Sequence, residues 1–472
     1  MEQPLGAVSL GGGAKLKTID CVAQSLAVGP IFSAAALGGI LALLSGGVGP
    51  FVIVLTTVGI LGLGYLVSEL AKRFSGSGTV YEFIANTLGK KPAVFAAGAY
   101  HAAASALVAA IPIVGGIFAK AFCAAHLGFD PPWWVMAIVI AAVIYALNVL
   151  GVQVSVKSQL AIIVASLVPF LILAIAILID GGPGGNTTTV FNPSKVAEGG
   201  SIFKGLMFAI LMFVGFELAA ALGEETENPR KSIPTAVLAT ILIVAAFYLL
   251  TQYVGAIGSE SAASQYDFGA LGKQYVGNWL GVLIELAVIL DMLAVGIGFC
   301  AATSRGIFTL ARDGLLPKPL ATVSSRNVPV MAINLELVTM AVIAIIALIK
   351  YGTKADDTGF PTVFNGFLVM STIGAFVISI VYAMLCVGGI VFFSKLGNYK
   401  AVIGAVVGLL TAGAGVLAQF ISGTAPVGDA LWGRHLGLIV LGAVAVWLVL
   451  NVMQRPERVD LAGQHALQHA EH

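Results

Sequence analysis

Residues 25–33 read SLAVGPIFS, and they decide how the rest of the chain is organised. They lie within an apolar segment long enough to cross a bilayer, yet the Gly-Pro pair interrupts the hydrogen bonds of a helix. We expect one half-helix to end near Ala27 and a second to begin at Pro30, because proline suits the first position of a helix. Residues 213–220, FVGFELAA, place Gly215 inside another apolar segment in the same way. Such breaks survive in lipid where they line a polar cavity, although a glycine kink for close helix packing is the alternative.

The chain around these breaks is too apolar for a soluble protein. Hydrophobic residues make up 58% of its 472 residues and charged residues 10%, whereas about 25% of a soluble domain is charged. A compact globule cannot hide so many apolar side chains, so the excess must face the lipid bilayer. The net charge of +1 provides no field that would attract nucleic acid, which argues against a nucleic-acid partner. We therefore expect an all-α polytopic membrane protein.

Twelve segments are apolar and long enough to cross about 30 Å of hydrocarbon as helices. Most of the 24 Lys and Arg residues lie in the loops on the side that carries the N-terminus. The positive-inside rule then places both termini in the cytoplasm of a multi-pass protein of the plasma membrane, which in a bacterium is the inner membrane. The segments are residues 21–44, 48–71, 92–125, 133–150, 158–179, 203–222, 235–258, 277–311, 328–349, 361–393, 401–421 and 432–453.

The two breaks, about 185 residues apart, indicate an internal repeat. The second and third segments recur as the seventh and eighth at nearly this offset, so five helices are followed by five more. Because five is odd, the second set crosses the membrane inverted. This division predicts a cytoplasmic N-terminal segment (1–18), a first repeat (19–180), an inverted second repeat (201–393), two further helices (401–453) and a cytoplasmic C-terminal tail (454–472).

Three segments carry a resemblance to a known family. They are FVGFELAAALGEETENPRKSIP at 213–234, YLVSELAKRFSGSGTVYEFIANTLGK at 65–90 and SRGIFTLARDGLLPKPLATVSSRNVPVMAI at 304–333. In order and spacing, they resemble amino acid permeases of the amino acid–polyamine–organocation (APC) superfamily. The resemblance implies a leucine-transporter-like fold, in which a helical bundle moves against a scaffold and a small amine or amino acid binds between the two breaks.

By position, the resemblance implies that a substrate amine meets backbone carbonyls at both breaks and that a substrate carboxylate meets the half-helix at Pro30. Many members of the family read Gly-Ser-Gly where this chain reads Val28-Gly29-Pro30, and Pro30 removes one donor N–H. A different carboxylate clamp and a substrate without an α-carboxylate both remain open. The implied substrate-binding residues are Leu26, Ala27, Val28, Gly29, Pro30, Ile31, Phe213, Val214, Gly215 and Phe216.

The sequence leaves the coupling ion open among three possibilities. Proton-coupled relatives often carry a Lys midway along the fifth segment, where this chain has Ser166, and a neutral Ser cannot exchange a proton near neutral pH. Ionisable groups inside spans are functional hypotheses by default, so Glu217 and Asp291 are candidates to carry the proton, with a structural buried carboxylate as the alternative for each. We expect proton coupling, with a cation site beside Ser166 or simple substrate exchange as alternatives.

A charged loop follows the sixth segment. Glu224 and Glu225 lie there, and they are candidates to pair with arginines of the segment 304–333 to form an inner gate. The alternative is a solvated face with weak surface pairs. The candidate arginines are Arg305, Arg312 and Arg326.

These patterns predict a secondary active transporter that moves an amino acid or a related small amine by alternating access. An exchanger, a sodium-coupled permease and a transporter-like nutrient sensor are alternatives, and a channel is disfavoured because paired breaks favour a closed central site. Neither HExxH nor GxSxG occurs, so we expect no enzyme activity, no cofactor and no metal site. The expected partners are the small-molecule substrate, the lipid bilayer and a coupling ion, either a proton or sodium.

Overall fold

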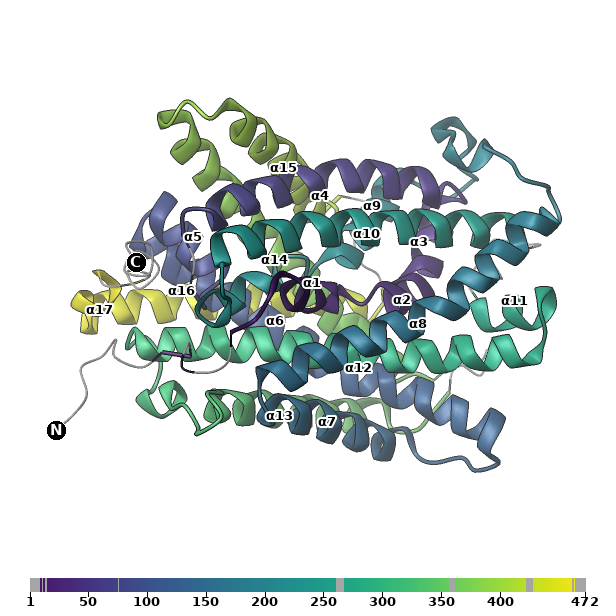
Figure 1. The fold of residues 1–472 in the computed structure, drawn as a ribbon, viewed down its shortest axis with the longest axis horizontal. Helices are drawn as coiled ribbons and strands as arrows, with labels where there is room; N and C mark the ends of the chain where they lie inside the picture. Colours follow the sequence, from purple (N-terminus) through teal and green to yellow (C-terminus); the bar gives the residue numbers. More distant parts are fainter. Residues whose placement is uncertain are drawn as a thin grey trace.

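The computed structural model describes residues 9–10, 12, 15–74, 76–259, 267–355, 361–421, 428–460 and 462. In these residues all regular secondary structure is helical, and the β-structure is limited to two isolated bridges (Figure 1). The all-α class is therefore confirmed. Much of the two predicted terminal segments, 1–18 and 454–472, lies outside the described residues.

Eleven helices of the described chain are long and apolar enough to cross a membrane. The two that correspond to the first and sixth predicted segments are interrupted, as the Gly-containing segments predict. They run from Thr18 to Ser45 (α1, η1, α2, η2, α3) and from Ile202 to Glu225 (α9, η6), and the others are Gly49–Ala71 (α4), Lys90–Leu127 (α6 and η3), Val152–Asp180 (α8), Pro229–Gly258 (α10), Asn278–Arg312 (α12), Val330–Tyr351 (α13), Phe364–Lys395 (α14), Tyr399–Leu417 (α15) and Ala430–Gln454 (α16).

The remaining predicted segment, 133–150, forms the apolar helix α7, Trp133–Val149. It has 17 residues, and at 1.5 Å per residue it is about 26 Å long, slightly less than the hydrocarbon core. All twelve predicted segments thus form helices, while twelve crossings and the inverted repeat stay predictions. The short elements are α5 (Val80–Thr87), η4 (Thr189–Phe191), η5 (Pro193–Lys195), α11 (Phe268–Tyr275), η7 (Lys318–Ala321) and α17 (Pro456–Asp460).

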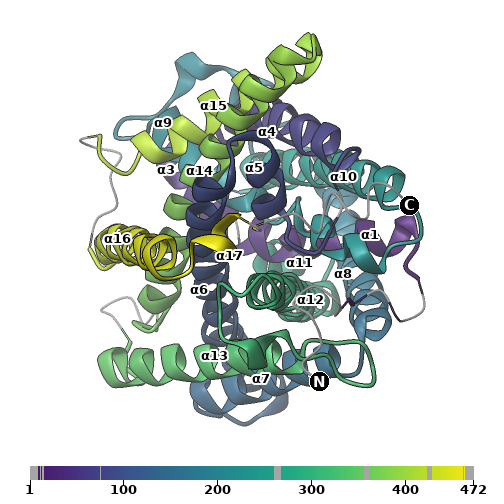
Figure 2. The same ribbon diagram turned by 90° about the vertical axis from the view of Figure 1, so that its left-hand side faces the viewer.

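The two interrupted helices lie in the interior of the bundle. Their most apolar windows are 72% and 83% buried by protein, whereas the corresponding window of α16 is 17% buried. Figure 2 shows α13, α15 and α16 at the periphery, where the apolar side chains on their outer faces have only lipid to face. A break placed inside the protein can satisfy its backbone groups with neighbouring side chains, which a break facing lipid cannot do.

Both ends of the described chain lie at the same end of the bundle. Near the N-terminus, the Leu10 N–H donates to Glu224 Oε2 at 3.2 Å, and Glu224 pairs with Arg312. Near the C-terminus, Arg458 Nη1 donates to the carbonyl of Gly314 at 2.9 Å, two residues beyond Arg312. This arrangement is the one that an even number of crossings requires.

Candidate substrate site between two interrupted helices

The first break lies where the sequence predicts it. Helix α1 (Thr18–Ser25) ends in a 3₁₀ turn, Leu26–Val28, and a new helical segment begins at Pro30. Between them Gly29 adopts φ 70° and ψ 68°, a left-handed conformation that L-residues with a Cβ rarely adopt. A Cβ at Gly29 would also collide with the Val295 side chain of α12. Glycine is therefore required here both by the backbone conformation and by the close approach of α12.

Asp291 of α12 binds the start of the second half-helix. Its Oδ2 accepts the N–H of Ile31 at 3.0 Å and the N–H of Phe32 at 2.8 Å. Ile31 and Phe32 are the two donors that a helix beginning at Pro30 leaves unsatisfied, and a carboxylate at a helix N-terminus is favoured by the helix dipole. Asp291 is thus placed at the first break, although its position in the sequence, 260 residues from Ile31, gave no sign of the contact.

The second break differs in detail from the prediction. Helix α9 ends at Phe213, residues 214–217 form a turn, and the inner half is a 3₁₀ helix that begins at Leu218. The inner half therefore begins two residues after Phe216, and not directly behind Gly215. The cause is Gly215, whose φ of 116° extends the turn before helical geometry resumes.

Glu217 braces this second break. Its Oε1 accepts the hydroxyl of Tyr100 at 2.7 Å, and its Oε2 accepts the N–H of Gly215 at 3.2 Å. The side chain is buried, with 1% of its surface exposed. Both carboxylate oxygens are thus engaged by the protein itself, one by α6 and one by the turn.

The two breaks are joined directly through Ser25. The Ser25 hydroxyl donates to the carbonyl of Phe216 at 2.8 Å and accepts the N–H of Ala219 at 3.2 Å. One small side chain at the end of α1 therefore holds the turn of the sixth span at the same depth as the break of the first. Sequence reasoning missed Ser25, because a lone Ser in a span carries no signal of its partner.

A small cavity of about 40 Å³ lies beside the joined breaks. Of the predicted substrate-binding residues, Val28 and Val214 line this cavity. Phe216 instead packs against the ring of Tyr382, with centroids 5.9 Å apart. Phe32 and Ser33, from the same interrupted span as Val28, line it as well. Residues from distant helices that sequence reasoning missed complete the wall, among them Val295, Phe299, Phe367 and Ser371. The wall is therefore apolar apart from two hydroxyls.

Ser166, the expected cation position, is buried, and its hydroxyl has no hydrogen-bond partner in the described chain. Two turns earlier on α8, Gln159 lies in an amide network. Gln24 Nε2 donates to the carbonyl of Gly298 at 2.7 Å, and Gln159 Nε2 is 3.4 Å from Gln24 Oε1. Uncharged amides therefore fill the junction of α1, α8 and α12, and they were not singled out from the sequence because amide side chains give no motif.

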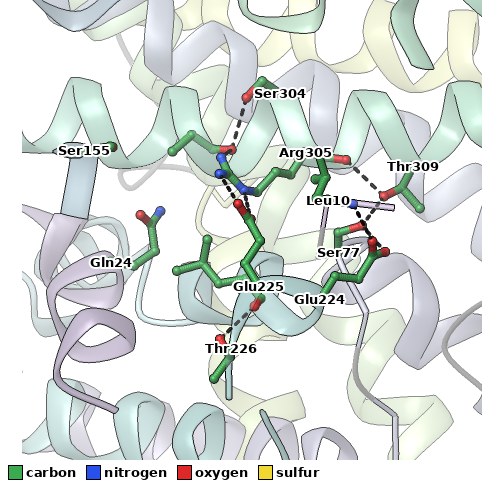
Figure 3. A network of polar contacts seen from close by, with 12 residues as sticks. Leu10, Gln24, Ser77, Ser155, Glu224, Glu225, Thr226, Ser304, Arg305 and Thr309 are labelled. Atoms are coloured by element: carbon green, nitrogen blue, oxygen red, sulfur yellow. Dashed lines mark hydrogen bonds and ion pairs between the residues drawn. The ribbon is translucent and has the colours of Figure 1, made fainter. Parts of the chain in front are cut away.

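Buried ion pairs close the end of the bundle that carries the termini. Arg305 donates to both oxygens of Glu225 at 2.5 and 3.0 Å (Figure 3). Arg312 donates to Glu224 at 2.8 Å. All four side chains are at least 93% buried. The expected alternative, a solvated face with weak surface pairs, is therefore wrong for these two glutamates. Arg326 lines a neighbouring cavity next to Glu225.

The N-terminal segment lies across this closure. Besides the Leu10 contact, the Leu16 N–H donates to the carbonyl of Glu225 at 2.8 Å, and Ser77 donates to Glu224 Oε1 at 2.8 Å. Glu82 of α5 is buried in the same region outside the spans, and burial raises its pKa to about 8. The nearby charge of Glu224 contributes to this rise of the pKa, while the charge of Arg312 acts against it.

The architecture defines a class of protein: an all-helical, multi-span membrane protein built around two interrupted helices. The profile of the amino acid permease family matches residues 22–453, and the chain belongs to that family. Its relatives are permeases and not enzymes.

Individual relatives agree with this assignment. An amino acid permease of Bacillus subtilis, YvbW, is 28% identical over 308 residues, which cover 60% of this chain and 66% of that protein. The aromatic amino acid transport protein AroP of Escherichia coli K12 is 33% identical over 264 residues, which cover 52% and 54%. The lysine-specific permease LysP of Lactococcus lactis is 29% identical over 279 residues, which cover 54% and 53%. The chain thus spans between about half and two thirds of these relatives.

A solved structure supports the fold alone. The manganese transporter of Eremococcus coleocola, crystallised with an aromatic bis-isothiourea compound, aligns with a TM-score of 0.53 and 10% identity. The alignment covers 93% of this chain and 95% of that chain. A likeness at this identity shows that the two chains share an arrangement of helices, and nothing about function or substrate.

Proposed function

We propose that this protein is a secondary active transporter that moves an amino acid or a related small amine across the plasma membrane by alternating access. The observation that carries the proposal is the meeting of two interrupted helices, joined through Ser25, beside one buried cavity. Broken spans of this kind expose backbone carbonyls and N–H groups at mid-depth, where they replace the hydration shell of a polar substrate.

Alternating access requires a closure that opens and closes on each side of the site. The ion pairs Glu225–Arg305 and Glu224–Arg312 supply such a closure at the end of the bundle that carries the termini, which the positive-inside rule assigns to the cytoplasm. The structure therefore represents a conformation closed on that side. Transport would proceed through separation of these pairs, which shifts the population toward an inward-open state.

Proton coupling is the proposed energy source, with Glu217 or Asp291 as the group that takes up the proton. Both carboxylates are buried beside the breaks, and neither is joined to a basic side chain by an ion pair within the described residues. A sodium site beside Ser166 is the first alternative, and its neighbours two turns earlier are Gln159, which binds Gln24 of α1, and Ser155. Substrate exchange without an ion is the further alternative.

Uptake into proteoliposomes tests the function and separates these modes. Amino acids and amines would be supplied under an imposed proton gradient, an imposed sodium gradient, or unlabelled substrate inside. We expect accumulation driven by the proton gradient and abolished by a protonophore. Sodium-driven accumulation or exchange alone would replace the proton mechanism, and ligand binding without any transport would turn the assignment toward a nutrient sensor.

A further inference from the structure

The N–H groups that begin the half-helix at Pro30 are already bound by the protein. Asp291 Oδ2 accepts from both Ile31 and Phe32, and the next N–H, of Ser33, donates to the carbonyl of Gly29 at 2.9 Å. Pro30 has no N–H to contribute. A substrate carboxylate placed at this half-helix would therefore find every donor engaged, and it would have to displace Asp291 to bind.

The charge at this point disfavours a second carboxylate. Asp291 is fully buried, and its other oxygen, Oδ1, has no hydrogen-bond partner in the described part of the chain. An additional carboxylate would meet the like charge of Asp291 in a poorly solvated environment, where repulsion is strong. An ammonium group would instead satisfy Oδ1 and neutralise the buried charge.

Asp291 also leaves two backbone carbonyls without their regular helical donors. The carbonyl of Ala27 would pair with Pro30 or Ile31, but Pro30 has no N–H and Ile31 donates to Asp291. The carbonyl of Val28 loses Ile31 and Phe32 for the same reason and keeps the hydroxyl of Ser33 at 3.3 Å. Carbonyl oxygens at the end of a half-helix attract cations, so the break as a whole favours positive charge.

The carboxylate lies next to the cavity. Asp291, Val295 and Phe299 follow one another at intervals of four residues on one face of α12, and the latter two line the cavity. Phe32, whose N–H binds Asp291, lines it as well. An ammonium group at Asp291 would thus have its carbon chain directed along an apolar wall.

We propose that the substrate is a cationic amine that carries no carboxylate, and that Asp291 is its counter-ion. The inference rests on the proposed transport function and narrows its substrate class. The ammonium donates to Asp291 Oδ1 and to the carbonyls of Ala27 and Val28, and the carbon chain fills the apolar cavity beside Val295 and Phe299. The carboxylate of Asp291 takes the place at the half-helix that a substrate carboxylate takes in an amino acid carrier.

Matched pairs of ligands test this directly. Alanine, valine, lysine and tyrosine would each be compared with the amine that remains after loss of the carboxylate, namely ethylamine, isobutylamine, cadaverine and tyramine. Binding to the purified full-length protein would be measured by titration calorimetry. Valinamide, which has the bulk of valine without its negative charge, separates a charge effect from a size effect. We expect at least one amine to bind at least about tenfold more tightly than its amino acid, and valinamide to bind better than valine.

Two variants assign the effect to Asp291. Asp291→Asn keeps an oxygen that accepts the N–H groups and removes the charge, so amine affinity should fall at least about tenfold while the fold is retained. Asp291→Ala frees the N–H groups of Ile31 and Phe32, so the affinity for the amino acid of the same pair should rise. If Asp291 had a purely structural role, these substitutions would lower the affinity for the amine and for the amino acid alike. Glu285→Gln on the same helix, which disrupts contacts to Lys273 and His126 far from the break, is the control.

The possible outcomes distinguish a failure of this inference from a failure of the proposed transport function on which it rests. If the amino acids bind as well as or better than their amines, or if Asp291→Asn binds the amine like the native protein, the inference is overturned while an amino acid transporter remains. If no member of any pair binds or is taken up, the inference and the proposed transport function both fall.

Discussion

Gly215 is the residue on which the second break depends. Its φ of 116° is unfavourable for a β-branched residue, and a Cβ there would lie 3.1 Å from the ring of Phe299, which lines the cavity. We expect Gly215→Val to weaken substrate binding at least about tenfold while the protein still elutes as a folded species. Gly413→Val on α15, where a Cβ meets no atom within 4 Å, is the matched control. Native affinity in Gly215→Val would remove this break from the binding site.

Glu217 is expected to act mainly through the two hydrogen bonds that it accepts. In Glu217→Gln one oxygen becomes an NH₂ group, so either Tyr100 or Gly215 loses its acceptor, at a cost of about 1–3 kcal/mol in unfolding free energy. We expect a lower melting temperature, measured in detergent, and Tyr100→Phe should reproduce part of the loss. If Glu217 also carries the proton, the pH profile of uptake will change in Glu217→Gln. An unchanged profile would leave Glu217 with the bracing role alone.

At the scale of these residues, the sequence predicted where the breaks lie but not what surrounds them. Gly29 and Gly215 can be recognised as breaks from the sequence, because glycine is unfavourable in the interior of a helix and marks a place where the helix can be interrupted. The partners that decide the chemistry, Ser25 and Asp291, come from positions about 190 and 260 residues away from the groups that they bind. No local pattern encodes such contacts, since they depend on how whole helices pack.

Helix α5 provides a prediction at the scale of one element. Burial gives Glu82 a pKa of about 8 in the folded protein, compared with 4.5 in the unfolded chain, so the folded state holds a proton that the unfolded state releases. Unfolding free energy should therefore fall as pH rises from about 4.5 to about 8, by at most about 1.4 kcal/mol per pH unit, and level off above. Melting temperatures recorded across this range should decline in the native protein and be flatter in Glu82→Gln.

Glu198→Gln, the same substitution at an exposed position, is the matched control for this experiment. The contradicting result is a melting temperature that rises with pH between about 4.5 and about 8 in the native protein and equally in Glu82→Gln. It would mean that Glu82 does not hold a proton in the folded protein over this range.

At the scale of elements, the helices could be predicted where a long apolar segment, ended or interrupted by Gly or Pro, marks each one. Every predicted segment forms a helix, including α7, whose 17 residues make its crossing the least certain from composition. The inner half of the sixth span was expected as an ordinary half-helix and is a 3₁₀ helix, Leu218–Glu225. Its geometry is fixed by tertiary bonds, from Ser25 at one end and Arg305 at the other, which local sequence preference cannot report.

At the scale of the whole molecule, the closed end links the termini to the site. The 3₁₀ helix that begins at the second break ends at Glu224 and Glu225, which hold Arg312, Arg305 and the N-terminal segment. Eight residues therefore connect the break to the closure, and we expect opening of the closure to displace the same helix. Under the proposed transport by alternating access, such a connection would keep the two sides of the site from opening at once.

Cys21 offers a reporter of this opening. The thiol is fully buried on α1 and lies 3.4 Å from the Thr226 hydroxyl, adjacent to Glu225. Arg305→Met leaves the Glu225 carboxylate buried without its partner, at a cost of about 3–5 kcal/mol to the closed state. In a protein whose other three cysteines are replaced by alanine, we therefore expect a water-soluble maleimide to label Cys21 at least about tenfold faster in Arg305→Met.

Adding Glu225→Gln to Arg305→Met should slow the labelling again, because it removes the unpaired buried charge and restores part of the closed population. Complete labelling after denaturation would establish that the thiol is intact in each variant. Equal labelling rates in the native protein and in Arg305→Met would mean that the pair does not hold this end closed. Faster labelling that Glu225→Gln reverses would identify the Glu225–Arg305 pair as the contact whose separation admits water to the inner half of the first span.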